Sequence, residues 1–373
     1  MADQLSNYQC PACTGPLQFS AATGKLECEY CGSSFEVAQI QALYAPKEEA
    51  AVAQAEPVQQ PAEPETQWDT SGLSDDWRGE DASLRAYVCP SCGAELLCEA
   101  TTAATSCPYC GNPTVVPGQF AGALKPDHVI PFKLQKKDAI NKLKAYYKGK
   151  PFLPGTFLAK HTVDKIQGVY VPFWLYDGQV TGDYRYKATL VHVHQEKDTE
   201  VTVTDHYVLE RQGSMRFEKV PVDASSKMPD DYMDSIEPYD YQELKPFSTA
   251  YLPGFLADRY DVPVEQANAR ADKRCIYSLE AGFEGTMKGF TTYTAFPDNP
   301  VHIQRGKVHY ALLPVWLLNV KYAEKDYLFA VNGQTGKVCG QLPVSKGRAW
   351  AFFAKLAVPL SALGALLAYI IVR

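Results

Sequence analysis

The sequence predicts an α+β fold that is mainly β, with small cysteine-rich units near the N-terminus, a large β-rich globular body with a few helices, and one apolar helix at the C-terminal end. Three observations support this prediction. Cys-X-X-Cys pairs occur four times within the first 110 residues. Alternating or continuous apolar runs dominate from about residue 127 to 344, a pattern typical of β-strands. The run 356–372 contains no charged residue.

The four Cys-X-X-Cys pairs form two tetrads with the same spacing. In each tetrad fourteen residues separate the two pairs, which is enough chain for one β-hairpin to bring four thiolates together. Four thiolates close a tetrahedral shell around Zn²⁺ and leave no position for a substrate, so we expect two structural zinc ribbons. The predicted ligands of the two zinc ions are Cys10, Cys13, Cys28, Cys31, Cys89, Cys92, Cys107 and Cys110.

These patterns divide the chain into five segments. Each ribbon is too small to bury much of a core, so its folding free energy must come largely from the metal. The segment between the ribbons is rich in Pro, Ala, Glu and Gln without apolar periodicity, which predicts a flexible tether. We expect zinc ribbon 1 at 1–40, an acidic flexible linker at 41–85, zinc ribbon 2 at 86–124, a β-rich globular domain at 125–345 and a C-terminal apolar segment at 349–373.

One stretch of the linker differs from the rest. Residues Trp68–Trp77 place two tryptophans and a leucine among acidic residues. Such a segment can dock on a protein partner, or it can pack on the protein's own body. The sequence leaves both alternatives open.

Most elements of the β-rich domain are predicted to be strands. Val171–Leu175 and Leu313–Leu317 share a pattern of proline, tryptophan and leucine. Two related halves of one domain would explain it, as would two buried strands of the same composition. Cys275 falls on the apolar face of the best-defined helix, so we expect it in the core. The predicted helices are 136–147 and 262–280, and the predicted strands are 169–176, 184–194, 200–209, 308–322, 327–331 and 337–342.

The C-terminal run has no polar face to present to water, so a transmembrane helix explains it better than a buried helix of the soluble body. Its helical length of about 25 Å crosses a bilayer once flanking residues are recruited. Three basic residues shortly precede the run and only Arg373 follows it, so the positive-inside rule leaves the N-terminal bulk in the cytoplasm. We therefore expect a single-pass protein of the cytoplasmic (inner) membrane, with a transmembrane anchor at 349–373.

The charges of the ribbons disfavour nucleic-acid binding. Residues 1–40 contain one lysine and four acidic residues, and residues 86–124 contain two glutamates and no basic residue. Affinity for phosphates depends on lysine and arginine, because counterion release supplies much of it. The formal net charge of −7 points the same way.

The sequence shows no catalytic motif. It contains no GxSxG nucleophile elbow. The segment that ends at Gly336–Lys337 resembles part of a phosphate-binding loop, but such a loop would need glycine at position 331, where the sequence has Val331. We therefore predict no catalytic and no cofactor-binding residue, and we expect that the protein is not an enzyme.

Three histidines allow a second kind of metal site. His192 and His194 point to the same side of a predicted strand, and His206 can lie across the hairpin from them. Three imidazoles can bind a transition metal. Exposed strand histidines are the commoner explanation, and the sequence does not decide between the two.

Several motifs carry a resemblance to a known family. The Cys-X-X-Cys pairs are shared with many proteins, whereas the motifs between residues 225 and 258 are more specific. The motifs are the cysteine pairs, Val171–Leu175, Ser225–Met228, Ser235–Asp240, Leu244–Phe247 and Tyr251–Asp258. With them the chain resembles a bacterial family of membrane-anchored proteins with transcription-factor-IIB-type zinc ribbons. Its similarity to primosomal-helicase ribbons is limited to the Cys motifs.

The resemblance implies an accessory docking role at the cytoplasmic membrane, beside stomatin/flotillin-like or phage-shock-type proteins. One departure from the pattern is Thr14, because glycine follows the other three cysteine pairs. We expect a zinc-binding, tail-anchored scaffold or adaptor that presents its cytoplasmic ribbons and β-rich domain to protein partners. The alternative is a membrane-tethered regulator that binds nucleic acid.

Overall fold

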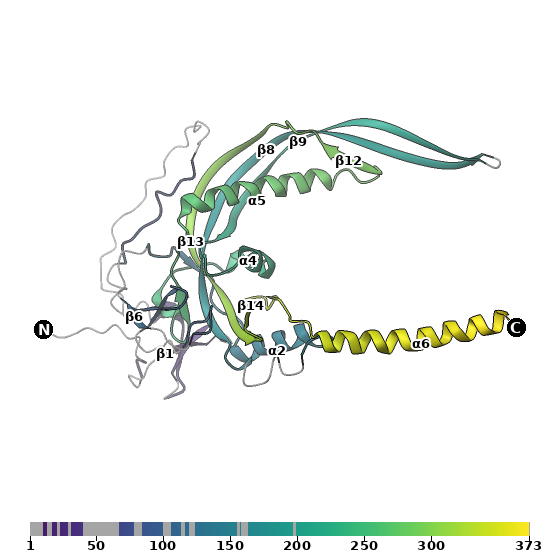
Figure 1. Cartoon of the computed structure of the whole chain (residues 1–373). Coiled ribbons are helices and arrows are strands. Elements are labelled where there is room, and N and C mark those ends of the chain that lie inside the picture. The colour runs from purple at the N-terminus through teal and green to yellow at the C-terminus, as the bar shows by residue number, and fades with distance from the viewer. Residues whose placement is uncertain are drawn as a thin grey trace.

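A computed structural model of the chain is shown in Figure 1. It describes residues 10–12, 17–20, 23–28, 31–39, 67–77, 84–99, 106–112, 116–118, 124–154, 157, 163–196 and 199–372. The predicted ligand Cys13 and residues 41–66 of the predicted linker lie outside these ranges. The described chain consists of a large β-sheet, a small one and few helices, as the sequence predicts.

Three long strands build the body. They are β8 (Gln167–Glu196), β9 (Thr199–Asp223) and β13 (Val301–Tyr322). β8 pairs antiparallel with β9 along one edge and with β13 along the other. In Figure 1 these strands curve as an arch, beyond which β8 and β9 continue as a long two-stranded arm. β12 (Thr292–Ala295) pairs with β8 at the start of the arm.

The predicted strand 169–176 and the first strand of the predicted hairpin are one continuous element. The sequence pattern Asp177–Gly178 suggested a strand end, but in the structure it forms a β-bulge. The pairing of β8 with β13 is irregular at the same level, between Arg305 and Val308. A Cβ atom on Gly306 would lie 2.5 Å from the Asp177 carbonyl oxygen, so glycine permits this close approach. Bulges bend a strand without ending it.

Both faces of β8 are buried near its start, which explains why its sequence there is continuously apolar rather than alternating. Successive side chains of a strand point to opposite faces, and here each face meets its own core. One core contains Tyr170, Trp174 and Tyr176, and the other contains Val169, Val171, Phe173 and Leu175.

Four α-helices that lie wholly within the described residues accompany the sheet. α2 (Lys136–Tyr147) has the predicted bounds, and α5 (Val264–Glu284) extends the predicted helix 262–280 by four residues at its C-terminal end. Cys275 is buried on the inner face of α5, as expected. The other helices are α4 (Asp230–Ile236), α6 (Lys346–Val372) and the 3₁₀ turns η2 (Tyr241–Glu243) and η3 (Thr249–Tyr251).

The two cysteine-rich units differ in their relation to the body. β1 (Leu17–Ser20), β2 (Lys25–Cys28) and β3 (Ser34–Phe35) form a small sheet of their own. The second unit joins the large sheet, because β5 pairs with β11 and β11 pairs with β8. The remaining strands are β4 (Leu84–Val88), β5 (Glu95–Glu99), β6 (Val116–Gly118), β7 (His128–Val129), β10 (Lys245–Pro246), β11 (Leu256–Asp258), β14 (Lys325–Asn332) and β15 (Val338–Gly340).

Candidate metal centre

The second tetrad lies on two tight turns of the same construction. Gly93 N donates to Cys89 O at 2.8 Å, and Gly111 N donates to Cys107 O at 2.9 Å. Both glycines have a φ of +70°, a conformation that glycine adopts without steric cost. The turns therefore hold the cysteines of each pair on one side of the loop.

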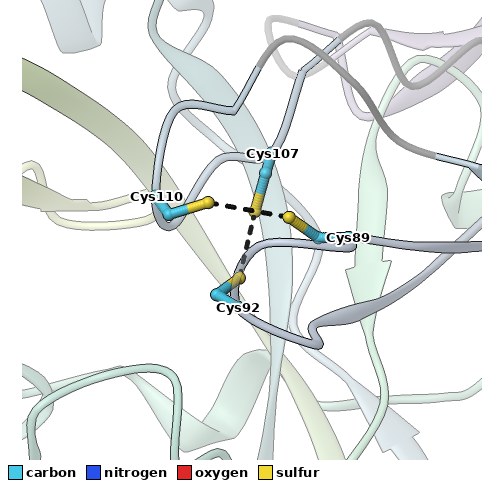
Figure 2. A group of neighbouring side chains, drawn as sticks. All are labelled: Cys89, Cys92, Cys107 and Cys110. Atoms are coloured by element: carbon cyan, nitrogen blue, oxygen red, sulfur yellow. Dashed lines mark hydrogen bonds between the residues drawn. The ribbon is translucent and has the colours of Figure 1, made fainter.

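The four sulfurs of this tetrad converge, as Figure 2 shows. Cys89 Sγ lies 3.6 Å from Cys110 Sγ, Cys92 Sγ lies 3.6 Å from Cys107 Sγ, and all four sulfurs are within 4.8 Å of one another. A disulfide would need about 2.05 Å. A tetrahedral zinc–thiolate site has Zn–S bonds of about 2.3 Å and hence sulfur–sulfur distances of about 3.8 Å. The four cysteines thus fit around a single metal ion of this kind.

The ionisation of these thiols sets the condition for metal binding. Burial by itself would raise the pKa of Cys89, but N–H groups of the turn and neighbouring thiols lower it to about 7. Burial raises the pKa of Cys92 to about 11 and also raises that of Cys107. Metal binding must therefore displace protons from the tetrad, so its affinity falls as the pH falls.

The first tetrad is described in part. Cys10, Cys28 and Cys31 place their sulfurs within 4.8 Å of one another, with Cys10 Sγ 3.5 Å from Cys31 Sγ. Gly32 has a φ of +72° and its N–H donates to Cys28 O at 2.9 Å. This turn repeats those of the second tetrad. The structure thus brings three of the four predicted ligands together, and Cys13 lies outside the described residues.

The second tetrad is joined to the body through the residues between its cysteines. The buried Tyr109 hydroxyl donates to Asp258 Oδ2 at 2.6 Å, and Ser225 Oγ donates to the same oxygen at 2.6 Å. Asn319 Nδ2 donates to Tyr109 O at 2.6 Å. Asp258 is 2% exposed, and this burial raises its pKa to about 7 although both hydroxyl donors lower it. The position of the second tetrad between the linker and the body favours its packing on the β-rich domain, but the sequence did not identify Asp258 as the partner of Tyr109, although Asp258 ends one of the family-like motifs.

The three histidines do not form a common site. Hydrogen-bonded neighbours directly opposite in a sheet point to the same face, and His206 lies opposite Thr189 while His192 lies opposite Val203. His206 therefore points to the other face of the arm from His192 and His194. His192 Nε2 instead lies 3.6 Å from Asp205 Oδ2. The three-imidazole hypothesis is wrong.

The segment Trp68–Trp77 packs on the body. Trp68 Nε1 donates to Asp272 Oδ1 at 3.2 Å, and its ring lies 4.7 Å from that of Tyr176. Trp77 makes an edge contact with Phe247 at 6.0 Å. Of the two alternatives for this segment, the structure supports intramolecular packing.

A cavity of about 450 Å³ opens at the double bulge of β8. Several polar groups at this cavity are paired within the protein. Asp177 accepts from Lys219 N at 2.7 Å and lies 3.4 Å from His309 Nε2. Arg305 donates to Asp272 at 2.7 Å. These pairs brace the bulge.

Helix α6 leaves the body by itself, as Figure 1 shows. Its residues Lys346–Leu366 have a mean hydropathy of 1.6 and are not buried against the body. Large apolar side chains are exposed along it, for example Trp350 at 71% and Leu360 at 64%. By length and composition α6 is a helix that can span a membrane.

Comparison with known proteins gives one informative match. No protein-family model matches the chain, and no solved structure matches it. The uncharacterized protein YdjG of Bacillus subtilis (strain 168) is 33% identical over 353 residues, which cover 95% of this chain and 94% of YdjG. Identity at this level extends over nearly the full length of both proteins. The chain therefore belongs to the same family as YdjG of Bacillus subtilis.

Proposed function

We propose that the protein is a zinc-binding, tail-anchored scaffold or adaptor of the cytoplasmic (inner) membrane, with its N-terminal bulk in the cytoplasm. The observation that carries this proposal is α6, a long apolar helix whose stretch Lys346–Leu366 is not buried against the body, attached to a body that holds clustered thiols. An exposed apolar surface of this size needs a partner, and a bilayer matches its length and composition. The basic residues that precede the run 356–372 support the orientation.

Zinc is the metal that the donor set favours. Thiolate ligands in a tetrahedral arrangement suit Zn²⁺, and a shell of four protein ligands is typical of structural rather than catalytic sites. The resemblance to proteins with transcription-factor-IIB-type zinc ribbons supports the same ion for both tetrads. In this role zinc stabilises the turns that carry the ribbon surface, and the protein has no catalytic activity.

The partners follow from the resemblance and from charge. Stomatin/flotillin-like or phage-shock-type membrane proteins are the partner classes that the resemblance implies. The acidic ribbons disfavour nucleic acid as the ligand, because phosphates would be repelled. The ribbon surfaces and the β-rich body therefore serve protein partners at the membrane.

The anchor is tested by fractionation of cells that produce the full chain. We expect the protein in the carbonate-washed membrane pellet, from which only detergent releases it. A chain that ends after Val344 should be soluble, and Leu360→Arg combined with Leu363→Arg should weaken retention, whereas the matched change Ser361→Leu should not. A full chain found in the soluble fraction would disprove the anchor.

The partners are tested by purification in mild detergent and mass spectrometry of the proteins that co-purify. We expect membrane proteins of the classes above, in amounts comparable with the bait. Retention on heparin or DNA that weakens steeply with salt would instead support the nucleic-acid-binding regulator.

A further inference from the structure

The outer edge of β9 is open. Along its length β9 pairs with β8, and no other strand pairs with it within the described ranges. In Figure 1 the arm formed by these two strands projects well beyond the end of α5. An open edge of this length presents a row of N–H and C=O groups that no strand pairs, which favours the addition of another strand. One of these groups, Glu210 O, accepts from the side chain of the next residue, Arg211 Nη1, at 2.8 Å.

The register of the arm shows which residues of β9 offer these groups. Arg185 O accepts from Phe296 N at 2.9 Å, so the odd-numbered residues of β8 direct their backbone groups away from β9. Hydrogen bonding alternates along an antiparallel pair, so the even-numbered residues of β8 bond to β9. Tyr186 lies opposite Leu209, and the odd-numbered residues of β9 are therefore already bonded. The even-numbered residues in the range 200–216 direct their N–H and C=O groups outward.

We propose that this edge pairs antiparallel with the same edge of a second copy of the chain, about a two-fold axis at Val208. A two-fold axis perpendicular to the sheet pairs even-numbered residues with even-numbered residues, as the outward backbone groups require. The β9 strands then join two arms into one continuous sheet. This assembly is independent of the proposed metal and membrane functions.

Charge complementarity selects this register. Residues equidistant from Val208 face one another, and oppositely charged residues directly opposite in a sheet stabilise it. Three such pairs result, and each occurs twice: Glu200 with Arg216, Asp205 with Arg211, and His206, when protonated, with Glu210.

Neighbouring registers lack this complementarity. An axis at Asp205, Glu210 or Arg211 would place two identical charges face to face, which is destabilising. An axis at residue 206, 207 or 209 would create no oppositely charged pair. Among the axis positions 205–211, only Val208 pairs opposite charges.

Apolar residues fit the same register. Val203, which is 40% exposed, would lie opposite Gly213 of the second copy. The Phe283 ring lies 3.2 Å from the position that a Cβ of Gly213 would occupy, so Val203 would gain an apolar neighbour. Val201 would lie opposite Met215, which packs against the same cluster as Phe283. Pairing therefore covers apolar side chains at the end of the arm.

Cysteine crosslinking of the full chain in detergent tests the register. Val208→Cys should form a disulfide-linked dimer on mild oxidation with diamide, because the Cα atoms of directly opposed residues lie about 5.5 Å apart. Thr202→Cys alone and Ser214→Cys alone should not, because each would lie roughly 40 Å from its own copy across the axis. The double variant Thr202→Cys with Ser214→Cys should crosslink, because these positions oppose each other. The unchanged chain is the control for its eleven native cysteines.

Charge exchange tests the interface without new thiols. The side chain of Arg216 is 79% exposed and Glu200 is exposed as well, so substitutions there leave the core intact. Arg216→Glu also removes the exposed ion pair in which Arg216 Nε lies 3.6 Å from Glu218 Oε1. Glu200→Arg or Arg216→Glu should each weaken dimer formation, measured by sedimentation in detergent, by about tenfold or more, because each creates two like-charge pairs. Both changes together should restore dimer formation to within about threefold of the unchanged chain.

The outcomes are decisive in both directions. Crosslinking at residue 208 together with rescue by the double charge exchange supports the β9 dimer. A chain that sediments as a monomer at all concentrations and does not crosslink at residue 208 overturns it. A Val208→Cys chain that crosslinks in cells to a different protein also overturns it, since the strand at this edge then comes from another partner.

Discussion

Tyr109 and Asp258, which are 149 residues apart in the sequence, are joined by a 2.6 Å hydrogen bond in which the tyrosine hydroxyl donates to Oδ2. Tyr109 lies between the cysteines of a metal-ligand pair, and Asp258 ends β11 at the centre of the large sheet. The bond therefore connects the metal-binding turn directly to the core. It makes the second ribbon part of the body's packing.

Tyr109→Phe should destabilise the protein by about 1–3 kcal/mol, because Asp258 loses one of its two hydroxyl donors in a buried site. Thermal unfolding of the detergent-solubilised chain, or hydrogen exchange at residues 106–112, measures the loss. Tyr87→Phe is the matched control within the same ribbon, and it should change stability by less than about 0.5 kcal/mol. Equal effects of the two changes would show that the hydroxyl of Tyr109 contributes nothing specific.

Asp258 should also give the protein a recognisable pH dependence. Its pKa is raised from 3.8 to about 7 in the folded protein, so between these values the folded state binds more protons than the unfolded state. Stability contributed by the protonated carboxyl is then present at low pH and is lost as the pH rises towards 7. Asp258→Asn should remove this dependence.

The comparison is the difference in unfolding free energy between the unchanged chain and Asp258→Asn at pH 5 and pH 8. Both proteins carry the same cysteines, so the pH dependence of metal binding cancels in the difference. The unchanged chain should lose on the order of 2–3 kcal/mol relative to the variant over this interval. A difference that is constant with pH would mean that Asp258 ionises normally in the folded protein.

Local pattern predicted the elements of this fold better than their connections. The spacing of the cysteines indicated the tetrads, and the apolar face of α5 placed Cys275 in the core. The length of β8 could not be predicted, because a turn and a bulge have the same local signature at Asp177–Gly178. Only the pairing of both neighbouring strands through this point distinguishes them.

Contacts between residues far apart in the sequence could not be predicted from local sequence pattern, for a physical reason. Trp174 Nε1 donates to Val262 O at 3.0 Å, and Trp316 Nε1 donates to Leu134 O at 3.1 Å. Each acceptor lies two residues before the start of a helix, α5 or α2. The repeated Pro-X-Trp pattern indicated that the two strands are similar, but the acceptors depend on how distant segments pack.

Substitution of one cysteine ligand should empty one metal site and leave the other occupied. The purified chain should contain about two zinc ions, one for each closed four-thiolate site, and Cys107→Ser should retain about one. Cys339→Ala, which changes a partly buried cysteine outside both tetrads, should retain two. Metal content is measured by mass spectrometry of the protein after removal of loosely bound ions. Loss of both ions from Cys107→Ser would show that the sites fold as one unit, and an unchanged count would exclude Cys107 as a ligand.

Alanine substitutions at two glycines of the metal-binding turns distinguish the cost of backbone strain in the turn from the cost of disturbing its contact with the body. Gly93 and Gly111 have the same φ of +70°, so alanine at either position should cost about 1 kcal/mol of stability through the left-handed conformation. A Cβ atom at Gly93 would meet nothing within 4 Å, whereas one at Gly111 would lie 3.2 Å from Asn319 Oδ1.

Asn319 Nδ2 also donates a hydrogen bond to Tyr109 O. Gly111→Ala should therefore disturb the contact of the second ribbon with the body and lower the unfolding free energy by roughly 1 kcal/mol more than Gly93→Ala does. Gly93→Ala serves as the matched control because it carries the backbone strain alone. Denaturant unfolding of the zinc-loaded proteins measures both values, and the extra cost should disappear in an Asn319→Ala background, where the contact no longer exists. If the two alanine variants lose equal stability in the presence of Asn319, the contact between Asn319 and the turn at Gly111 contributes nothing to stability.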